Sequence, residues 1–212
     1  CTMNFDLSEE QLLIQTTARE FAKKELAANA EALDKGEGRE TFLSNLSSLA
    51  ELGFMGLNVD PNYGGTGAGT IAFSLAITEL ARACASTAVT VSVTNMVAEV
   101  IQSVASEEQK QTYLPKICGG EYPAAGFCLT EPGAGSDPSA MRTSAVKDGD
   151  QWVLNGSKAY ITSGEYAGVF VVWAVTDKES KRGKGISCFL VERETPGLEV
   201  GPAEEKMGQK GS

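Results

Sequence analysis

Two short segments of the chain combine glycine, proline and hydroxyl side chains in a pattern that suits a ligand-binding loop. The first, FCLTEPGAGSDPS at 127–139, starts as an apolar run and continues with two prolines, two glycines, two acids and two serines. Glycine lets the backbone approach a bound group closely, and proline reduces the entropy lost when a loop becomes ordered. Thr130 and Ser136 add hydroxyls that donate and accept hydrogen bonds. The loop would suit a flat heteroaromatic group or a phosphate chain, although these residues taken alone favour a plain surface loop.

The second segment, LNGSKAYITSG at 154–164, places an aromatic side chain two residues before a threonine. If this stretch is extended, Tyr160 and Thr162 point to the same side, so a ring and a hydroxyl would face one ligand together. Core packing explains such a pair more often than ligand binding when the pair is considered alone. Its occurrence together with the first segment strengthens the interpretation of both as parts of a ligand site.

Two common kinds of catalytic site are excluded. Gly133-Ala134-Gly135 begins like the dinucleotide-binding fingerprint, but Ser136-Asp137-Pro138 follows, so the third glycine is absent. No helical pattern follows the loop and the elements do not alternate as βαβ, so a Rossmann-type nicotinamide site is not expected. The chain has no histidine, which rules out a Ser-His-Asp triad, a Cys-His pair and a His-ligated metal within it. No metal site is predicted.

Composition indicates an ordinary globular protein of one large or two smaller domains. Its 212 residues are 42% hydrophobic and 22% charged, with a formal net charge of −10. Such an acidic chain is not expected to bind nucleic acid, which needs clustered Lys and Arg. The tightest basic group is interpreted as a solvated hairpin loop and consists of Lys178, Lys181, Arg182 and Lys184.

The cysteines and the start of the chain indicate in which cellular compartment the protein is expected. The cysteines are odd in number, far apart and without a CxxC pair, which indicates reduced thiols in a cytosol-like compartment; they are Cys1, Cys84, Cys118, Cys128 and Cys188. No apolar run is long enough to span a bilayer. The start shows neither a secretory leader nor an Arg-rich presequence, and it lacks Met, which is consistent with a trimmed start. A cytoplasmic location, or the mitochondrial matrix in a eukaryote, is therefore expected.

The hydrophobic period is helical through about residue 118. The tetrads SEEQ at 8–11 and 106–109 have the form of a capping box and predict helix starts, the second helix ending near Pro115. Helices are also predicted around 42–53, ending at Gly53, and at about 71–84, with a Gly-rich irregular stretch between them. Val and Thr content alone would make the first half of 86–105 a strand. The helical spacing of its apolar residues instead predicts a buried helix, with apolar positions Val89, Val93, Met96, Val97, Val100, Ile101 and Val104.

After Gly119-Gly120 the pattern becomes that of strands. Asp148-Gly149 is a hairpin signal, and Thr195-Pro196-Gly197 marks another turn. Helices followed by strands predict an α+β fold, with an all-α helical domain at 1–120 and an antiparallel β-barrel-like domain at 121–212. The candidate strands are Tyr122–Thr130, Arg142–Lys147, Gln151–Asn155, Val169–Thr176 and Ile186–Glu192.

In several segments the chain resembles the acyl-CoA dehydrogenase family of flavoproteins. The most specific are LTEPGAGSD at 129–137 and LNGSKAYIT at 154–162, which match the family's motifs together. PNYGGTG at 61–67, SEEQKQTYLPKICGGEY at 106–122 and TPGLEVGPAEEKMGQKGS at 195–212 match in the family's order and spacing. The resemblance covers essentially the whole chain as the N-terminal and middle portions of a longer protein, and implies that FAD binds against an incomplete middle β domain.

The resemblance also implies a role for each matched residue. Thr130 would reach the pyrimidine side of the flavin, and the Thr162 hydroxyl would bond flavin N5. Tyr160 matches an aromatic residue that packs on the flavin face away from substrate, and Ser136 matches a serine near the flavin pyrophosphate and the substrate's pantetheine arm. The full cofactor-binding set that the resemblance implies is Phe127, Cys128, Leu129, Thr130, Ser136, Tyr160, Ile161 and Thr162.

The activity implied is α,β-dehydrogenation of an acyl-CoA thioester, as in fatty acid β-oxidation. A carboxylate removes the α-proton, a hydride passes from the β-carbon to flavin N5, and an electron-transferring flavoprotein receives the electrons. The resemblance further implies a homotetramer or dimer for the full-length protein.

No catalytic base is predicted within these 212 residues. In the family the catalytic base is a glutamate in a C-terminal helical domain. The chain is therefore expected to be a fragment that is inactive by itself. Glu131 is a tempting substitute, but a loop acid that accepts local hydrogen bonds is the favoured interpretation. The alternatives left open are an acyl-CoA oxidase or desulfinase on the same fold, and a binding module without turnover.

Overall fold

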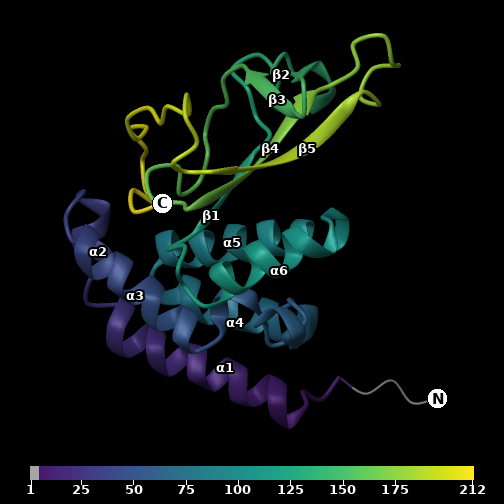
Figure 1. The fold of residues 1–212 in the computed structure, drawn as a ribbon. Coiled ribbons are helices and arrows are strands. Elements are labelled where there is room, and N and C mark those ends of the chain that lie inside the picture. The colour runs from purple at the N-terminus through teal and green to yellow at the C-terminus, as the bar shows by residue number, and fades with distance from the viewer. Residues whose placement is uncertain (1–4) are drawn as a thin grey trace. The chain divides into compact units, whose positions relative to one another are not determined.

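The computed structural model describes residues 5–212, in which helices are followed by a mixed sheet, and the predicted α+β class is confirmed (Figure 1). The chain divides into two compact units. The helical unit runs to Ala124 and also includes Glu205–Ser212, and the β unit spans Ala125–Glu204. The break therefore falls slightly later than the expected boundary after residue 120, and the last eight residues group with the helices.

Helices make up nearly all of the first unit. In chain order they are α1 (Glu9–Phe21), a π-helical turn (Ala22–Leu26), α2 (Ala30–Asp34), α3 (Arg39–Glu51), 3₁₀ turns at Phe54–Gly56 and Pro61–Tyr63, α4 (Gly69–Ala83), α5 (Ala85–Val104) and α6 (Glu107–Cys118). α1 packs on α4, α4 on α5 and α5 on α6. Among the described residues, none of these helices has the length and apolar character needed to cross a membrane.

Both predicted capping boxes are confirmed. The Ser8 Oγ accepts from the Gln11 amide at 3.2 Å, and the Gln11 side chain accepts from the Ser8 amide at 3.0 Å. Ser106 and Gln109 repeat the arrangement at 3.3 and 2.9 Å. The predicted end of α6 near Pro115 is wrong, because the helix continues to Cys118 with the proline inside it. Buried Leu114, Ile117 and Cys118 favour that last turn, and their packing outweighs the loss of one helical hydrogen bond.

α5 is the buried helix that the apolar spacing predicts, but its buried face is a different one. Val97 and Ile101 are buried as expected, whereas Met96 is 40% and Val104 is 66% exposed. Small and hydroxyl side chains fill much of the buried face, since they let neighbouring helices approach closely. The buried residues of α5 are Ser86, Thr87, Ala88, Thr90, Val91, Thr94, Asn95, Val97, Ala98 and Ile101.

Asn95 connects α5 to the irregular segment before α4. Its side chain accepts from the Leu57 amide at 2.7 Å and donates to the Phe54 carbonyl at 2.8 Å, entirely out of contact with water. Gln102, two turns further along α5, accepts from the Asp60 amide at 2.7 Å. These bonds give the irregular segment a fixed place on the helix without making it a regular element.

We expect Asn95→Ala to destabilise the helical unit by about 2–4 kcal/mol. The change leaves the buried Leu57 amide and the buried Phe54 carbonyl without this partner, and each such loss costs about 1–3 kcal/mol. Urea unfolding followed by circular dichroism measures this. Gln102→Ala is the matched control on the same helix, and should cost below about 1 kcal/mol. The bond from the Asp60 amide that it removes is exposed, and its bond to the Asn58 carbonyl is long, at 3.4 Å, and half-buried. Equal losses for the two variants would contradict the role given to Asn95.

The sheet of the β unit is built around its central strand, β4. The strands are β1 (Ala125–Cys128), β2 (Ser144–Asp148), β3 (Gln151–Asn155), β4 (Val169–Val175) and β5 (Ile186–Glu192). β4 pairs with β1, β2 and β5, and β2 pairs with β3. The bounds of β3 and β5 are as predicted, while β1 and β4 are shorter than predicted and β2 is shifted towards the C-terminus.

The expectation of an antiparallel sheet is wrong for two of the pairings. β1 and β4 are parallel, with Ala125 opposite Val169 and Cys128 opposite Val172, and β2 meets β4 in parallel at one residue pair. Parallel partners need a long crossover. The chain between β1 and β4 supplies it, because that stretch contains both motif segments and the β2–β3 hairpin. The parallel pairing therefore places the end of β1, and the loop after it, at an edge where the second motif segment also passes.

Candidate functional site

The two motif segments lie against one another at the end of β1. Lys158 donates from its Nζ to the Leu129 carbonyl at 3.1 Å and to the Glu131 carboxylate at 2.9 Å. The Ala159 amide donates to the Thr130 carbonyl at 2.9 Å. Three consecutive residues of the first segment are thus bonded to two consecutive residues of the second. A shared site would require such a contact between the two segments.

Glu131 is a local hydrogen-bond acceptor, as the favoured interpretation of this residue has it. Only 6% of the residue is exposed, and its carboxylate accepts from the Arg142 amide at 2.6 Å and the Thr143 amide at 2.9 Å, besides Lys158. Burial would raise the pKa of Glu131, but the hydrogen bonds from Thr143, the Arg142 amide and Lys158 outweigh it and lower the pKa to about 2. A carboxylate so stabilised in its ionised form, with both oxygens already engaged, is a poor proton acceptor.

The predicted hydroxyls are left free by the fold. Thr130 and Thr162 are half-buried and Ser136 is exposed. Within the part of the chain that the structure describes, none of these three hydroxyls makes a hydrogen bond to another residue. Nearby, the Ser163 Oγ is buried and also lacks a partner among the described residues. Since buried polar groups in folded proteins nearly always have a partner, this edge of the β unit has capacity to bond a ligand.

The segment around Tyr160 is not extended, so the argument that Tyr160 and Thr162 share one side of a strand is wrong. β3 ends at Asn155, a turn begins at Thr162, and Tyr160 has a left-handed backbone with φ of 59°. Ser163 is left-handed as well, with φ of 63°. Such conformations cost a non-glycine residue about 1–2 kcal/mol each and concentrate at functional sites.

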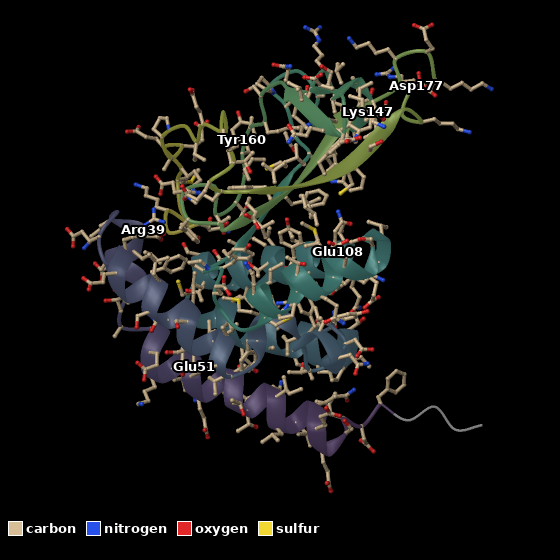
Figure 2. The ribbon with its side chains drawn as sticks, viewed as in Figure 1. Arg39, Glu51, Glu108, Lys147, Tyr160 and Asp177 are labelled. Carbon is tan, nitrogen blue, oxygen red and sulfur yellow. The ribbon has the colours of Figure 1, made fainter. Side chains whose placement is uncertain are left out.

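Long-range contacts on both sides of Tyr160 account for this backbone. On one side the Ala159 amide is bonded to Thr130, and on the other Ile161 packs into the core beside Cys128 and Phe170. The Tyr160 ring is left 77% exposed, well away from Asp177 in the β4–β5 loop (Figure 2). The ring is therefore available to cover a ligand, even though the geometry that makes it so differs from the expected one.

The remaining predicted residues can contact a ligand mainly through their backbone. Cys128 is buried in the core, and burial raises the pKa of its thiol to about 12, so it is an unreactive side chain. Phe127 packs edge-on against Trp173, with ring centroids 6.2 Å apart. The Nε1 of Trp173 is buried without a partner among the described residues. The Leu129 carbonyl is already used by Lys158.

The second half of the first loop is held by the β4–β5 hairpin. Asp137 accepts from Ser139 and from Arg182, and these interactions help to lower the pKa of Asp137. The basic group predicted as a solvated hairpin loop is confirmed, since Lys178, Lys181, Arg182 and Lys184 lie exposed between β4 and β5.

Sequence reasoning missed Lys158, although a usable signal was present. The first segment carries two acids, Glu131 and Asp137, and the second segment carries a single charge of the opposite sign, Lys158. Once the segments are predicted to meet, Glu131 and Lys158 are natural partners.

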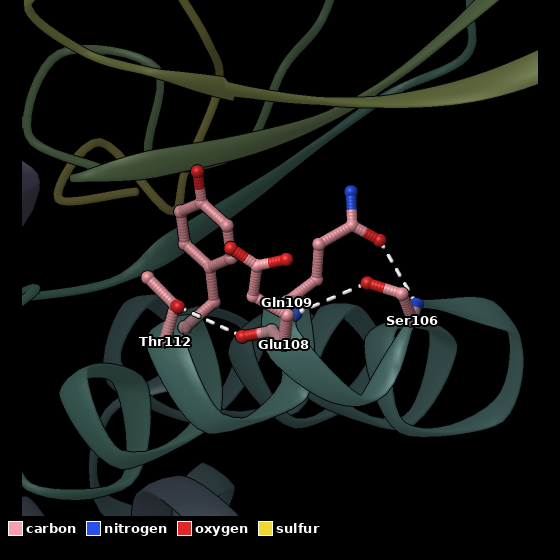
Figure 3. Close-up of a pocket in the computed structure, with 5 residues that line it drawn as sticks. Ser106, Glu108, Gln109 and Thr112 are labelled. Carbon is pink, nitrogen blue, oxygen red and sulfur yellow. Dashed lines mark hydrogen bonds between the residues drawn. The ribbon is translucent and has the colours of Figure 1, made fainter.

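A hollow of about 530 Å³ on α6 carries none of the predicted site residues (Figure 3). All of its lining residues come from this helix and its N-cap, Ser106. Several of them are used by the capping box and by the bond from the Thr112 hydroxyl to the Glu108 carbonyl. The described residues also contain no group of three or more acidic or thiol side chains arranged to hold a metal ion.

Acid should weaken the β unit through Glu131. Its pKa is about 2 in the folded chain against an ordinary value of 4.5, so the unfolded chain binds more protons between these values and the stability falls as pH drops through that range. The difference corresponds to about 3 kcal/mol. We expect the gap in unfolding free energy between wild type and Glu131→Gln to be widest above pH 4.5 and to close towards pH 2, measured by urea unfolding at stepped pH. A difference in unfolding free energy that does not change with pH would contradict the role given to Glu131.

Family models match almost the whole chain. One described as acyl-CoA dehydrogenase, N-terminal domain, matches residues 8–121, and one described as acyl-CoA dehydrogenase, middle domain, matches residues 126–212. The chain is also 40% identical over 212 residues to a probable acyl-CoA dehydrogenase YngJ of Bacillus subtilis, covering 99% of this chain and 55% of that protein. It spans about half the length of the curated relatives it matches.

Solved structures agree in fold over the same length. Butyryl-CoA dehydrogenase from Megasphaera elsdenii superposes with a TM-score of 0.89 at 36% identity, over 99% of this chain and 55% of that one. An acyl-CoA dehydrogenase from Bacillus anthracis complexed with FAD gives a TM-score of 0.88 at 33% identity, over 99% of this chain and 35% of that one. Because the two family models together account for both compact units, the chain belongs to the acyl-CoA dehydrogenase family.

Proposed function

We propose that this chain provides the flavin-binding part of an FAD-dependent acyl-CoA dehydrogenase, which oxidises the α,β carbon–carbon bond of an acyl-CoA thioester. The observation that carries the proposal is the contact between the two motif segments, made through Lys158 and Ala159, which leaves the hydroxyls of Thr130 and Thr162 unused. Relatives whose names carry the same activity, one of them complexed with FAD, support it.

The residues at this edge of the β unit fit FAD. An isoalloxazine ring needs polar partners at its edges and an apolar or aromatic surface on its face, and the free hydroxyls and the exposed Tyr160 ring offer both. The buried Ser163 Oγ and Trp173 Nε1, which lack partners among the described residues, add further bonding capacity. When bound, FAD supplies a hydride acceptor, which protein side chains cannot provide.

Each residue has a distinct part in this proposal. The backbone of Phe127–Thr130, together with Ile161, lines the flavin, with the Thr130 hydroxyl at its pyrimidine side. The Thr162 hydroxyl donates towards N5, and the Tyr160 ring covers the face away from substrate. Ser136 contacts the pyrophosphate and the pantetheine arm of the thioester. No described residue is assigned as the base that removes the α-proton, since Glu131 is fully engaged by its hydrogen bonds.

The wider biology of the proposal rests on the family resemblance. Electrons would pass to an electron-transferring flavoprotein, the full-length protein would assemble as a homotetramer or dimer, and the reaction would belong to fatty acid β-oxidation. The cytoplasm, or the mitochondrial matrix in a eukaryote, is the proposed location.

Removing either proposed flavin-contacting hydroxyl should weaken FAD binding. We expect Thr130→Val and Thr162→Val each to raise the FAD dissociation constant about 2- to 10-fold, which is the net worth of one hydrogen bond. Valine keeps the shape and the β-branch, so the fold should be unchanged. Thr195→Val, at an exposed turn of the same unit, is the matched control and should bind FAD as wild type does. The measurement is a fluorescence titration of FAD, and unchanged affinity in both variants would remove these residues from the site.

The visible absorption of the bound flavin tests the reaction itself. The product of the complete gene should purify with flavin absorption bands, and anaerobic addition of saturated acyl-CoA thioesters should bleach them as the flavin is reduced. Colour without bleaching would instead support a binding module. Reoxidation by dissolved oxygen as fast as turnover would support the oxidase alternative, and the absence of any flavin binding would contradict the proposal.

A further inference from the structure

We propose that Glu131 and Lys158 form a positioning pair, which fixes the two flavin-binding segments in register and keeps their contact electrically neutral. The inference rests on the proposed function and adds two residues to it that would not themselves touch the cofactor.

The pair is buried on both sides, unlike the six ion pairs compared with it below. Lys158 has 9% of its side chain exposed and Glu131 has 6%. At least one partner is exposed by 35% or more in each of the pairs Arg19–Glu79, Lys24–Glu25, Lys35–Glu31, Arg82–Glu79, Lys116–Glu121 and Arg182–Asp137. The two residues are 27 positions apart in the chain, so the contact is a property of the fold and not of a local turn.

The bonds of the pair surround Thr130. Lys158 reaches the Leu129 carbonyl on one side of Thr130 and the Glu131 carboxylate on the other. Between them, the Thr130 carbonyl accepts from Ala159, which immediately precedes Tyr160. A shift of Lys158 would therefore move Thr130 and Tyr160 relative to each other, and these are the residues proposed to meet different parts of one ring.

Glu131 adds a third segment to the same contact. Besides Lys158, its carboxylate accepts from the amides of Arg142 and Thr143, just before β2. The chain leaving the loop is thus tied to the loop's start. Both charges have partners, and the positive and negative charges cancel beside the strand end.

Stability alone is a weak reason for such a pair. Removing two charges from water costs more than their attraction returns in many proteins, and apolar replacements of buried pairs are often neutral or stabilising. What a buried pair provides is one arrangement of its segments, because any other arrangement leaves a buried charge without a partner. A function that depends on the register of two loops is consistent with that property.

The test compares three variants of the complete gene product reconstituted with FAD: Glu131→Gln, Lys158→Met, and both together. We expect each single variant to bind FAD at least about ten-fold more weakly, by analogy with metal sites, where loss of a residue that orients a ligand lowers metal affinity about 10- to 100-fold. The midpoint potential of the bound flavin should rise in Glu131→Gln, which leaves a positive charge, and fall in Lys158→Met, which leaves a negative one. A purely structural role would not move the potential in opposite directions.

The double variant separates positioning from stability. It carries no unpaired charge, so its melting temperature should recover towards that of wild type, while its FAD affinity should stay low because the register is no longer fixed. Hydrogen exchange of the Ala159 amide should accelerate in all three variants, which reports the register without any cofactor. If a single variant fails to fold, the double variant decides the question through these two readouts.

Glu79→Gln is the matched control in the other compact unit. Glu79 is a carboxylate with 3% of its side chain exposed and is bonded to Arg19 at 2.8 Å, so its loss destabilises the chain without touching the flavin segments. Its FAD affinity and potential should equal those of wild type. If wild type binds no FAD, the proposed function fails and this inference fails with it. If wild type binds but the variants match it in affinity and potential, the inference alone is overturned.

Discussion

A buried carboxylate must have its hydrogen-bond acceptors satisfied, and in the β unit this requirement organises the loop edge around Glu131. Its oxygens accept from two consecutive backbone amides and from Lys158, drawing three separate stretches of chain to one point. Because an unpaired buried charge is far more costly than an unpaired hydroxyl, this arrangement takes precedence over the conformation of its neighbours. Tyr160 and Ser163, both with a left-handed backbone, follow the segment that Lys158 and Ala159 hold in place.

Local signals in the sequence were sufficient for much of the fold. The capping boxes at Ser8 and Ser106 depend only on residues three positions apart, and they are found where predicted. The bounds of β3 and β5 follow from alternation and turn residues, and they agree with the structure. For α5 the apolar spacing gave the right element against the strand propensity of its Val and Thr residues, because a period of 3.6 is a property of the helix itself.

The errors fall where distant parts of the chain decide the outcome. Which face of α5 is buried depends on the helices it meets, and these accept its small and hydroxyl residues in preference to Met96 and Val104. The parallel pairing of β1 with β4 depends on a crossover whose course no local pattern encodes. For the candidate site, the sequence pointed to the two segments that the structure brings into contact, but it predicted neither the buried pair that joins them nor the turn at Tyr160.

In the site, the charged groups at the contact of the two segments are buried, and the uncharged hydroxyls are left for a ligand. The charges of Glu131 and Lys158 are consumed inside the protein, whereas the hydroxyls of Thr130 and Thr162 remain available. Leaving a hydroxyl without a protein partner costs little free energy, because water can hydrogen-bond to it until a ligand binds. If charged groups were exposed there instead, binding of a ring would have to remove their water, which costs far more free energy than removing water from a hydroxyl. A loop that must be rigid by itself and still bind a flat, largely uncharged ring is therefore expected to bury the charges nearest the ring and to present hydroxyls there. Glu131 and Lys158 are buried and Thr130 and Thr162 are unused in this way at the end of β1.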